Sequence, residues 1–251
     1  MICHGDAKAL EWCAIAYLSQ DKVAIQEIWD KIDQHSDNQR VFGLPSRLIA
    51  KKFVFRLIYG GSAYAYYMDT DFSDVGFSVK QWQDVIDAFY NKYKGIKAYH
   101  TALMKEATST GKIVMPTGRW YPFKKYFKES TGEWEWPRTT ILNYPVQGFG
   151  HDLMSIARVS LKSKLKHHRL EHKMLCTVHD SIDVDCPDDG TVEKVTELFI
   201  ETFDDIPTNY EKLFGHKFNV PMTVEMQYGM DLKNLFETKE EVYENIEGGF
   251  N

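Results

Sequence analysis

The chain has 251 residues, of which 43% are hydrophobic and 14% aromatic, so it can bury a substantial core and is not disordered by composition. Its four cysteines form no Cys-x-x-Cys pair, which argues against a zinc site, and no apolar run approaches the roughly 18 residues that a membrane-spanning helix needs. The formal net charge of −6 is unusual for a protein that holds a nucleic-acid duplex unaided, because Lys and Arg contacts to phosphate dominate that affinity.

The chain opens with a predicted short strand over residues 2–6, which ends at Asp6 and is followed by a predicted helix over residues 7–31. Two interpretations of Asp6 are open at this point. It can cap the helix through its carboxylate, which is the commoner role of an Asp at this position, or it can bind a metal ion.

The next helix carries four residues spaced four apart: Arg47, Lys51, Phe55 and Tyr59. Because an α-helix turns about 100° per residue, a step of four returns to nearly the same face. That face offers cations at one end and rings at the other, which suits a ligand with phosphates at one end and an aromatic base at the other. A half-buried amphipathic helix is the alternative interpretation of this segment.

A long helix is predicted over residues 78–110, followed by strands and turns over 112–138. Thr131-Gly132 predicts a hairpin turn, after which Trp134 and Trp136 share one face of a strand. We expect this pair in the core or at a partner interface rather than stacked on nucleic-acid bases.

A helix predicted over residues 143–169 ends in a run of basic residues, which is typical of a solvated face or of contacts to a duplex backbone. Strands over 174–178 and 182–186 then form a predicted hairpin with Asp180 at its bend. Asp180 is open to two interpretations, a turn residue or a metal ligand. A helix over 191–203 and a strand over 222–227 complete an α+β pattern.

Two aspartates that follow apolar runs, with a cationic helix between them, indicate phosphoryl-transfer chemistry. Transfer by two metal ions needs carboxylates that hold the ions roughly 3.5–4 Å apart. Asp6 and Asp180 are the candidates for this role.

These segments, in this order, resemble DNA polymerase family A, the bacterial DNA polymerase I-like enzymes, in a divergent phage-like form. Residues 6–11 resemble the family's motif A, in which an Asp binds both metals and a Glu five residues later blocks a ribose 2′-hydroxyl. Residues 47–60 resemble motif B, the fingers helix that binds the incoming nucleotide. His179 and Asp180 resemble motif C, which supplies the second metal carboxylate.

Further segments extend the resemblance from residue 5 to about residue 235. Asn143 and Gln147 resemble the family's minor-groove and template-contacting pair, and Arg119 follows Thr117-Gly118 as in the segment that touches the primer strand. Residues 220–226 resemble the closing strand of the palm.

The resemblance implies an α+β fold, with a polymerase palm made of a small antiparallel sheet and helices, and a helical fingers subdomain. The expected domains are palm with motif A over residues 1–20, fingers with motif B over 21–112, and palm with motif C and the closing strand over 113–251. Thumb and exonuclease domains are expected to be absent, because only residues 1–5 precede the motif A aspartate. We therefore expect an excised fragment, or one half of a split polymerase whose partner chain supplies the thumb and upstream palm.

The implied activity is that of a DNA-directed DNA polymerase, which transfers a nucleotide from a dNTP to the 3′-hydroxyl of a primer on a DNA template. Asp6, Asp180 and Lys51 are the expected catalytic residues. Two Mg²⁺ ions are the expected cofactors, held by the two aspartates. Lys51 is also placed to protonate the departing pyrophosphate.

The resemblance assigns the remaining residues to binding. The expected nucleotide-binding residues are Arg47, Lys51, Phe55, Tyr59 and Glu11, of which Glu11 and Tyr59 exclude a 2′-hydroxyl. The expected contacts to primer–template DNA are Asn143, Gln147, His179 and Arg119. We expect no membrane contact and a cytoplasmic location, in the bacterial host if the chain is phage-encoded.

Two departures from the family keep other functions open. Ser181 replaces the Glu that usually follows the motif C aspartate, and Asp183, two residues further on, is expected to be a solvent-facing charge. His-Asp-Ser is the usual motif C sequence in single-subunit RNA polymerases, so a related enzyme of that kind is one alternative. Glu11 and Gln147 argue against this alternative. A polymerase subunit that binds DNA or a partner without catalysis is the other.

Overall fold

The structure is a computed structural model that describes residues 1–248, and its chain forms two compact units. The first, here called the sheet unit, comprises Met1–Leu10 and the chain from Gly150 onward. The second, the helical unit, is Glu11–Phe149. The palm and fingers boundaries expected from the sequence remain a prediction, and the last three residues of the expected second palm segment lie outside the described residues.

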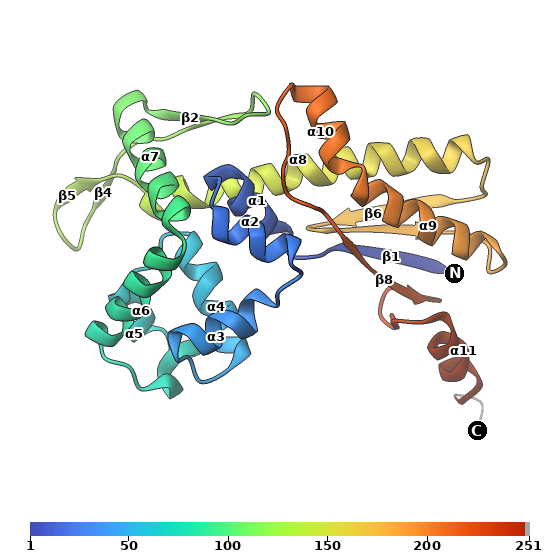
Figure 1. The fold of residues 1–251 in the computed structure, drawn as a ribbon, viewed down its shortest axis with the longest axis horizontal. Helices are drawn as coiled ribbons and strands as arrows, with labels where there is room; N and C mark the ends of the chain where they lie inside the picture. The colour runs from blue at the N-terminus through green and yellow to red at the C-terminus, as the bar shows by residue number, and fades with distance from the viewer. Residues whose placement is uncertain (249–251) are drawn as a thin grey trace. The chain divides into compact units, whose positions relative to one another are not determined.

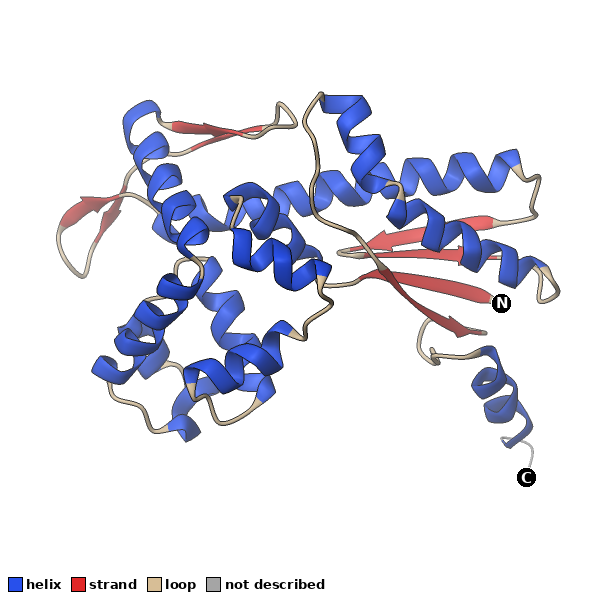
Figure 2. Cartoon of the chain, in the orientation of Figure 1, coloured by secondary structure: helices blue, strands red, loops and turns tan. Residues whose placement is uncertain are grey.

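The chain combines helices with short strands (Figures 1 and 2). The strands are β1 Ile2–Ala7, β2 Lys112–Val114, β3 Trp120–Pro122, β4 Tyr126–Lys128, β5 Glu133–Glu135, β6 Lys173–Val178, β7 Ser181–Asp185 and β8 Val224–Gly229. The helices are α1 Leu10–Ser19, α2 Lys22–Trp29, α3 Gln34–Phe42, α4 Arg47–Ile58, α5 Ala63–Met68, the 3₁₀ helix η1 Thr70–Val75, α6 Val79–Lys92, α7 Lys94–Thr110, α8 Arg138–His167, α9 Thr191–Asp204, α10 Ile206–Phe214 and α11 Lys239–Gly248.

The sheet unit is built on a four-stranded antiparallel sheet in the order β6-β7-β1-β8. Because side chains alternate along a strand, Cys3, Gly5 and Ala7 share one face of β1. A side chain at Gly5 would meet the ring of Phe199 at 2.5 Å, so α9 packs directly on this face and only glycine fits there. The alternation leaves Asp6 on the opposite face. The expected α+β fold with a small antiparallel sheet is confirmed.

The helical unit has an aromatic core that fixes the orientation of α4. Phe53 on α4 stacks with Trp82 of α6 and contacts Tyr66 of α5, with ring centroids 6.0 Å and 5.2 Å away. The residues of α4 that face this core are fully buried: Ala50, Phe53, Val54, Leu57 and Ile58. The stripe from Arg47 to Tyr59 therefore lies on the helix face that is turned away from the core.

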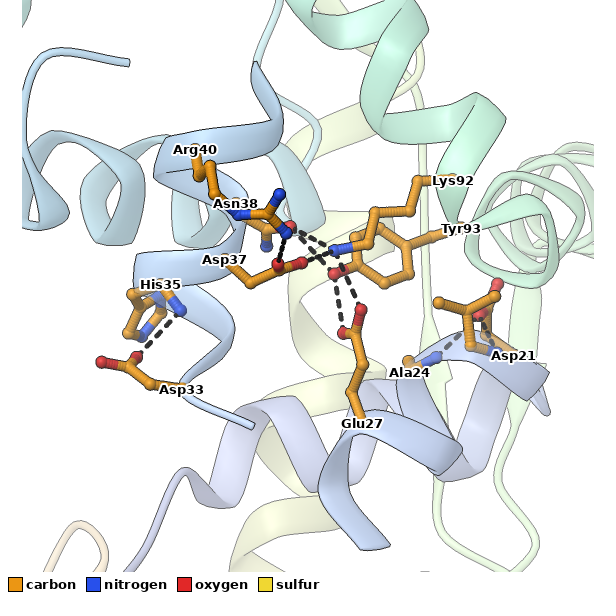
Figure 3. A network of polar contacts seen from close by, with 11 residues as sticks. Asp21, Ala24, Glu27, Asp33, His35, Asp37, Asn38, Arg40, Lys92 and Tyr93 are labelled. Atoms are coloured by element: carbon orange, nitrogen blue, oxygen red, sulfur yellow. Dashed lines mark hydrogen bonds and ion pairs between the residues drawn. The ribbon is translucent and has the colours of Figure 1, made fainter. Parts of the chain in front are cut away.

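A buried polar network joins three helices of this unit (Figure 3). The Lys92 ammonium at the end of α6 lies 2.9 Å from Glu27 of α2 and 2.7 Å from Asp37 of α3. The Tyr93 hydroxyl donates to Glu27 at 2.8 Å and lies 2.9 Å from the side-chain amide of Asn38. Burying a charge without a partner costs free energy, so these charged side chains must stay paired. The pairing therefore specifies how α2, α3 and α6 pack.

Two helices expected to be continuous are each broken. The helix predicted over 7–31 is α1 and α2, and the helix predicted over 78–110 is α6 and α7. The buried carboxylate of Asp21 accounts for both breaks. One of its oxygens caps α2 by accepting the amides of Val23 and Ala24, while the other accepts the amide of Gly95 at 2.6 Å in the first turn of α7.

Two other expectations also need correction. The helix predicted over residues 143–169 begins earlier, at Arg138, and carries Pro145 inside it. Trp134 is 64% exposed, so the core, the first of the two locations expected for it, is wrong, while the other location, a partner interface, stays a prediction. The physical reason is that the strands β4 and β5 make their main contacts with each other, and no second layer covers the Trp134 ring.

Candidate active site

Asp6 and Asp180 meet at one end of the sheet. Asp6 lies near the end of β1, and Asp180 lies in the two-residue turn between β6 and β7. The Ala7 amide donates to the Asp180 carbonyl oxygen at 2.8 Å, which ties this turn to β1. His179 has a φ of 54°, a left-handed conformation that a tight hairpin turn requires and that a residue with a side chain adopts at some cost.

The electrostatics of this corner are those of unneutralised carboxylates. Burial raises the pKa of Asp6 to about 6, with further contributions from the charges of Asp180 and Glu225 and from a hydrogen bond to Asp180. His4 acts in the opposite direction. Two carboxylates in contact repel one another unless a proton or a cation lies between them, so Asp6 and Asp180 form an environment suited to a bound cation.

The donor set fits a hard divalent cation such as Mg²⁺. Within residues 1–248, no group of three or more His, Cys, Asp or Glu is arranged to enclose a metal ion. Mg²⁺ is commonly held by one or two carboxylates and keeps water and substrate oxygens as its other ligands, so a pair is sufficient. Asp6 and Asp180 are the residues that would hold it.

Glu225 is a third carboxylate at this corner, which the sequence did not assign to the site. It is the direct partner of Asp6 in the pairing of β1 with β8, and it forms an ion pair with Lys8 at 2.9 Å. The sequence signal was present, because the closing strand was recognised and alternation places every second residue on one face. Without the pairing register, however, Glu225 could not be placed opposite Asp6.

Asp183 is buried, and the expectation of a solvent-facing charge is wrong. Only 2% of it is exposed. Its carboxylate lies 2.6 Å from the Nδ1 atom of His4 and accepts a hydrogen bond from the Cys176 thiol at 3.1 Å. The reason is the register, which places His4 directly opposite Asp183 and supplies a partner for the charge.

The predicted nucleotide-binding stripe lies on α4 in the helical unit. Ser46 caps the helix by accepting the Ile49 amide at 3.2 Å. The Lys51 ammonium lies 5.9 Å from the centre of the Phe55 ring, so the expected cation and ring are neighbours. Both residues line a surface hollow of about 380 Å³.

Arg47 already has an anionic partner. Its guanidinium binds the Asp33 carboxylate with an Nε–Oδ2 distance of 2.7 Å, and this pairing holds the pKa of Asp33 well below its usual range. Asp33 also caps α3 through the amides of His35 and Ser36 (Figure 3). An incoming anion would therefore share Arg47 with Asp33 or displace it.

His35 lies beside the α4 stripe, although no pattern in the sequence indicated this residue. Its ring lies 5.7 Å from the Phe55 ring. Burial, together with the charges of Arg47 and Lys51, lowers the pKa of His35 to about 4, so the imidazole is neutral at physiological pH. It therefore extends the uncharged, ring-bearing part of this surface.

Tyr59, Glu11 and Gln147 are brought together although they are distant in sequence. The Tyr59 hydroxyl donates to Glu11 Oε1 at 2.9 Å. Burial raises the pKa of Tyr59, the Glu11 charge adds to this effect, and a hydrogen bond with the Gln147 side chain opposes it. The two residues expected to exclude a 2′-hydroxyl thus form one hydrogen-bonded unit with an expected template contact.

The remaining expected DNA contacts lie at accessible positions. Asn143 is half-buried and lies one helical turn before the exposed Gln147 on α8. Arg119 is exposed in the turn before β3, and His179 is exposed in the β6–β7 turn. Gly148 packs against the Tyr121 ring so closely that a side chain would not fit, which explains the glycine after Gln147.

The candidate residues thus form two groups. Asp6, His179 and Asp180 belong to the sheet unit, and the others belong to the helical unit, which contains Glu11, Arg47, Lys51, Phe55, Tyr59, Arg119, Asn143 and Gln147. Within the helical unit, contacts join Lys51 with Phe55, and Tyr59 with Glu11 and Gln147.

Comparison with known structures gives the class of fold. The POL domain of Pol1 from M. smegmatis, solved in complex with DNA primer-template and dNTP, matches with a TM-score of 0.74 at 20% sequence identity. The match covers 91% of this chain and 39% of that one. The fold is therefore that of a polymerase domain.

The sequence comparisons give the family. The model of DNA polymerase family A matches residues 1–234, and the chain belongs to this family. DNA polymerase I of Caldicellulosiruptor bescii is 25% identical over 95% of this chain and 27% of its own length. DNA polymerase I of Lactococcus lactis subsp. cremoris is 25% identical over 74% of this chain and 22% of its own length.

The chain therefore spans about a quarter of the length of these curated relatives. Over the described part of the chain, none of the helices combines the length and the apolar character that crossing a membrane requires.

Proposed function

We propose that this chain carries the nucleotidyl-transfer site of a DNA-directed DNA polymerase. The observation that carries the proposal is the contact between Asp6 and Asp180 at the end of the sheet, where burial, together with the charges of Asp180 and Glu225, raises the pKa of Asp6 to about 6. Membership of DNA polymerase family A supports it, as does the likeness to a polymerase domain that was solved with DNA and dNTP.

Asp6 and Asp180 would hold two Mg²⁺ ions. When bound, these ions make the 3′-hydroxyl of a primer more acidic and stabilise the charge on the departing pyrophosphate. The chain's own contribution is to fix the two carboxylates, since the β1 amide of Ala7 anchors Asp180 and the register places Asp6 beside it. Glu225, paired with Lys8, adds negative charge at the rim of this site.

The α4 stripe would bind the incoming dNTP. Lys51 and Arg47 supply positive charge for the triphosphate, and Lys51 is also placed to give a proton to pyrophosphate. Phe55, with the neutral His35 ring beside it, offers an apolar surface to the sugar or base. Arg47 must exchange part of its pairing with Asp33 for phosphate, which would tie nucleotide binding to the position of α3.

Tyr59 and Glu11 would exclude ribonucleotides. The hydrogen bond between them holds the phenol and the carboxylate in a fixed relation, so a 2′-hydroxyl would have to displace a satisfied pair. Gln147, which also bonds to Tyr59, would contact the template together with Asn143. Arg119 and His179 would contact the primer strand.

The chain would act together with the parts of a family A polymerase that lie upstream of motif A. Those parts, the thumb and upstream palm, would be a covalent segment of a longer protein or a separate partner chain. Either arrangement would supply further contacts to the primer–template, which fits the net charge of −6 on this chain.

Primer extension tests the proposal. The assay uses Mg²⁺, a labelled primer on a DNA template and either four dNTPs or four NTPs, with this chain alone and with a chain that supplies the upstream palm and thumb. We expect template-dependent extension with dNTPs and little with NTPs. Preference for NTPs would favour an RNA polymerase, and absence of extension by a folded protein under both conditions would favour a non-catalytic subunit.

A further inference from the structure

A cationic and aromatic segment stands out in an otherwise acidic chain. Residues 111–128 contain five cations and no Asp or Glu: Lys112, Arg119, Lys124, Lys125 and Lys128. The chain as a whole has a net charge of −6, so this segment is a local exception. Cations interleaved with rings are typical of surfaces that bind nucleic acid, because phosphates take the charges and bases take the rings.

The segment leads into the β4–β5 hairpin of the helical unit, which presents two rings to solvent. Phe127 pairs with Trp134 across the hairpin, and their ring centroids are 5.8 Å apart. Phe127 is 51% exposed and Trp134 is 64% exposed. In the ribbon the hairpin projects away from the helices of its unit (Figures 1 and 2).

The two faces of the hairpin differ in charge. Tyr126 pairs with Glu135 and Lys128 pairs with Glu133, and the Lys128 ammonium lies 3.1 Å from Glu135. Because side chains alternate along strands, these charges occupy the face opposite Phe127 and Trp134. The two acidic residues of the β5 strand, Glu133 and Glu135, thus lie on the face opposite the rings, and Glu135 is paired with Lys128.

Two exposed cations adjoin the hairpin in the chain. Lys124 and Lys125 are both exposed and immediately precede β4. Exposed aromatic side chains flanked by cations combine stacking with phosphate attraction, whereas a purely apolar patch would suit a protein partner.

We propose that the face of the β4–β5 hairpin formed by Phe127 and Trp134 is a platform for single-stranded DNA, with bases stacked on the rings and phosphates held by Lys124 and Lys125. The proposal deepens the proposed function and rests on it for the identity of the strand, which would be the unpaired part of the template. The binding itself requires no catalysis.

Fluorescence anisotropy of a labelled oligothymidylate of about 20 nucleotides tests the platform in the full chain at low salt. In the test variant, Phe127→Leu and Trp134→Leu are combined, which removes both rings and keeps apolar bulk. We expect binding to weaken by about tenfold or more, since stacking on one ring is worth roughly this factor. The matched control is Trp29→Leu on α2, which removes a tryptophan that is 58% exposed outside the cationic segment, and its affinity should equal wild type.

The salt dependence gives a second readout that does not depend on the leucine variant folding. Combining Lys124→Gln with Lys125→Gln should reduce the slope of log affinity against log salt by about 1.4, which is roughly 0.7 per lost phosphate contact to a single strand. An unchanged slope would contradict the role of the two lysines.

Failure of this proposal can be told apart from failure of the proposed function. Asp180→Ala should abolish extension but bind the oligothymidylate as wild type does, so loss of oligonucleotide binding only in the hairpin variants supports the platform even if no extension is seen. Wild-type affinity in a folded leucine variant would overturn it. The proposal would also be overturned if the chain self-associates, if this self-association is lost in the leucine variant, and if the DNA affinity is unchanged. That result would assign the face to a second copy of the chain.

Discussion

The carboxylate of Asp6, the residue proposed to hold a metal ion, lies in an environment that opposes its charge. Its pKa is raised to about 6 because it is partly buried beside Asp180 and Glu225. Because this pKa is higher in the folded chain than its usual value of 3.8, the folded state loses stability as the pH rises from about 3.8 to about 6, and the loss persists above that range. The repulsion is the feature that a bound cation would relieve.

This leads to a prediction for the protein without metal. Asp6→Asn should raise the free energy of unfolding at pH 7 by about 1 kcal/mol, a value kept small because the group is partly exposed and solvent screens it. Chemical denaturation in the presence of a chelator measures this. Addition of Mg²⁺ should stabilise wild type and not the variant, and a destabilised Asp6→Asn protein would contradict the electrostatic account.

Glu11 carries the prediction for substrate choice. Glu11→Ala removes the acceptor of the Tyr59 hydroxyl and opens space beside it. We expect extension with ribonucleotides to become at least about tenfold more efficient relative to deoxynucleotides, because the excluded 2′-hydroxyl no longer displaces a paired group. The ratio of kcat/KM for dNTP and NTP measures the effect, and an unchanged ratio would remove Glu11 from this role.

At the level of elements, the sequence predicted α4 and the strands around Asp6 and Asp180 better than it predicted helix ends. The step of four on α4 is a local pattern, and glycine and proline mark its limits. The breaks at Asp21 and Tyr93 have no such local signal. They depend on one buried carboxylate that bonds to amides of two helices, and that is a tertiary contact between residues over 70 positions apart.

The same distinction explains the errors within the site. Asp6, Asp180 and the α4 stripe are recognisable from neighbouring residues in the chain. Asp183 was expected at the surface because its partner His4 lies on another strand, and only the register reveals the pair. His35 lies beside Phe55 through the packing of α3 on α4, which no pattern in its own segment indicates.

The polar network of α2, α3 and α6 supports a prediction about element packing. Lys92→Met would leave the carboxylates of Glu27 and Asp37 without their shared cation in a largely buried setting. Removal of one partner from a buried charge cluster costs about 3 kcal/mol or more, so a large fall in the free energy of unfolding is expected. Denaturant titration measures it, with Lys80→Met, an exposed change on the same helix, as a control that should remain within about 0.5 kcal/mol of wild type.

At the scale of the whole molecule, two histidines with lowered pKa values contribute to the dependence of stability on pH. Burial and the Arg138 charge lower the pKa of His100 to about 4, and His35 has a pKa lowered to about 4 as well. Between this value and the usual 6.5, the unfolded chain binds more protons than the folded one. Stability should therefore be lost as the pH falls from about 6.5 to about 4. The raised pKa of Asp6 acts in the opposite direction over part of the same range.

Thermal melts between about pH 7.5 and about pH 4.5 test whether the histidines or Asp6 have the larger effect on stability. This range covers most of the interval between the usual and the lowered histidine pKa values. We expect the melting temperature to fall on acidification, and His100→Gln to reduce that fall, since a fully buried histidine with this shift accounts for about 3 kcal/mol. His168→Gln, at an exposed position, is the matched control. A melting temperature that rises on acidification would contradict this account and show that carboxyl groups with raised pKa values, such as Asp6, dominate.

The chain as a whole belongs to DNA polymerase family A, and its proposed activity depends on one pair of carboxylates. The most direct test is single-nucleotide incorporation into a primer–template, with the upstream chain present, by Asp6→Asn, Asp180→Asn and the control Asp185→Asn. Asp185 lies on β7 and is half-exposed, so its substitution changes charge without touching the pair. The account predicts a loss of about a thousandfold or more for the first two variants and near wild-type rates for the control. Substantial incorporation by either Asp6→Asn or Asp180→Asn would contradict it.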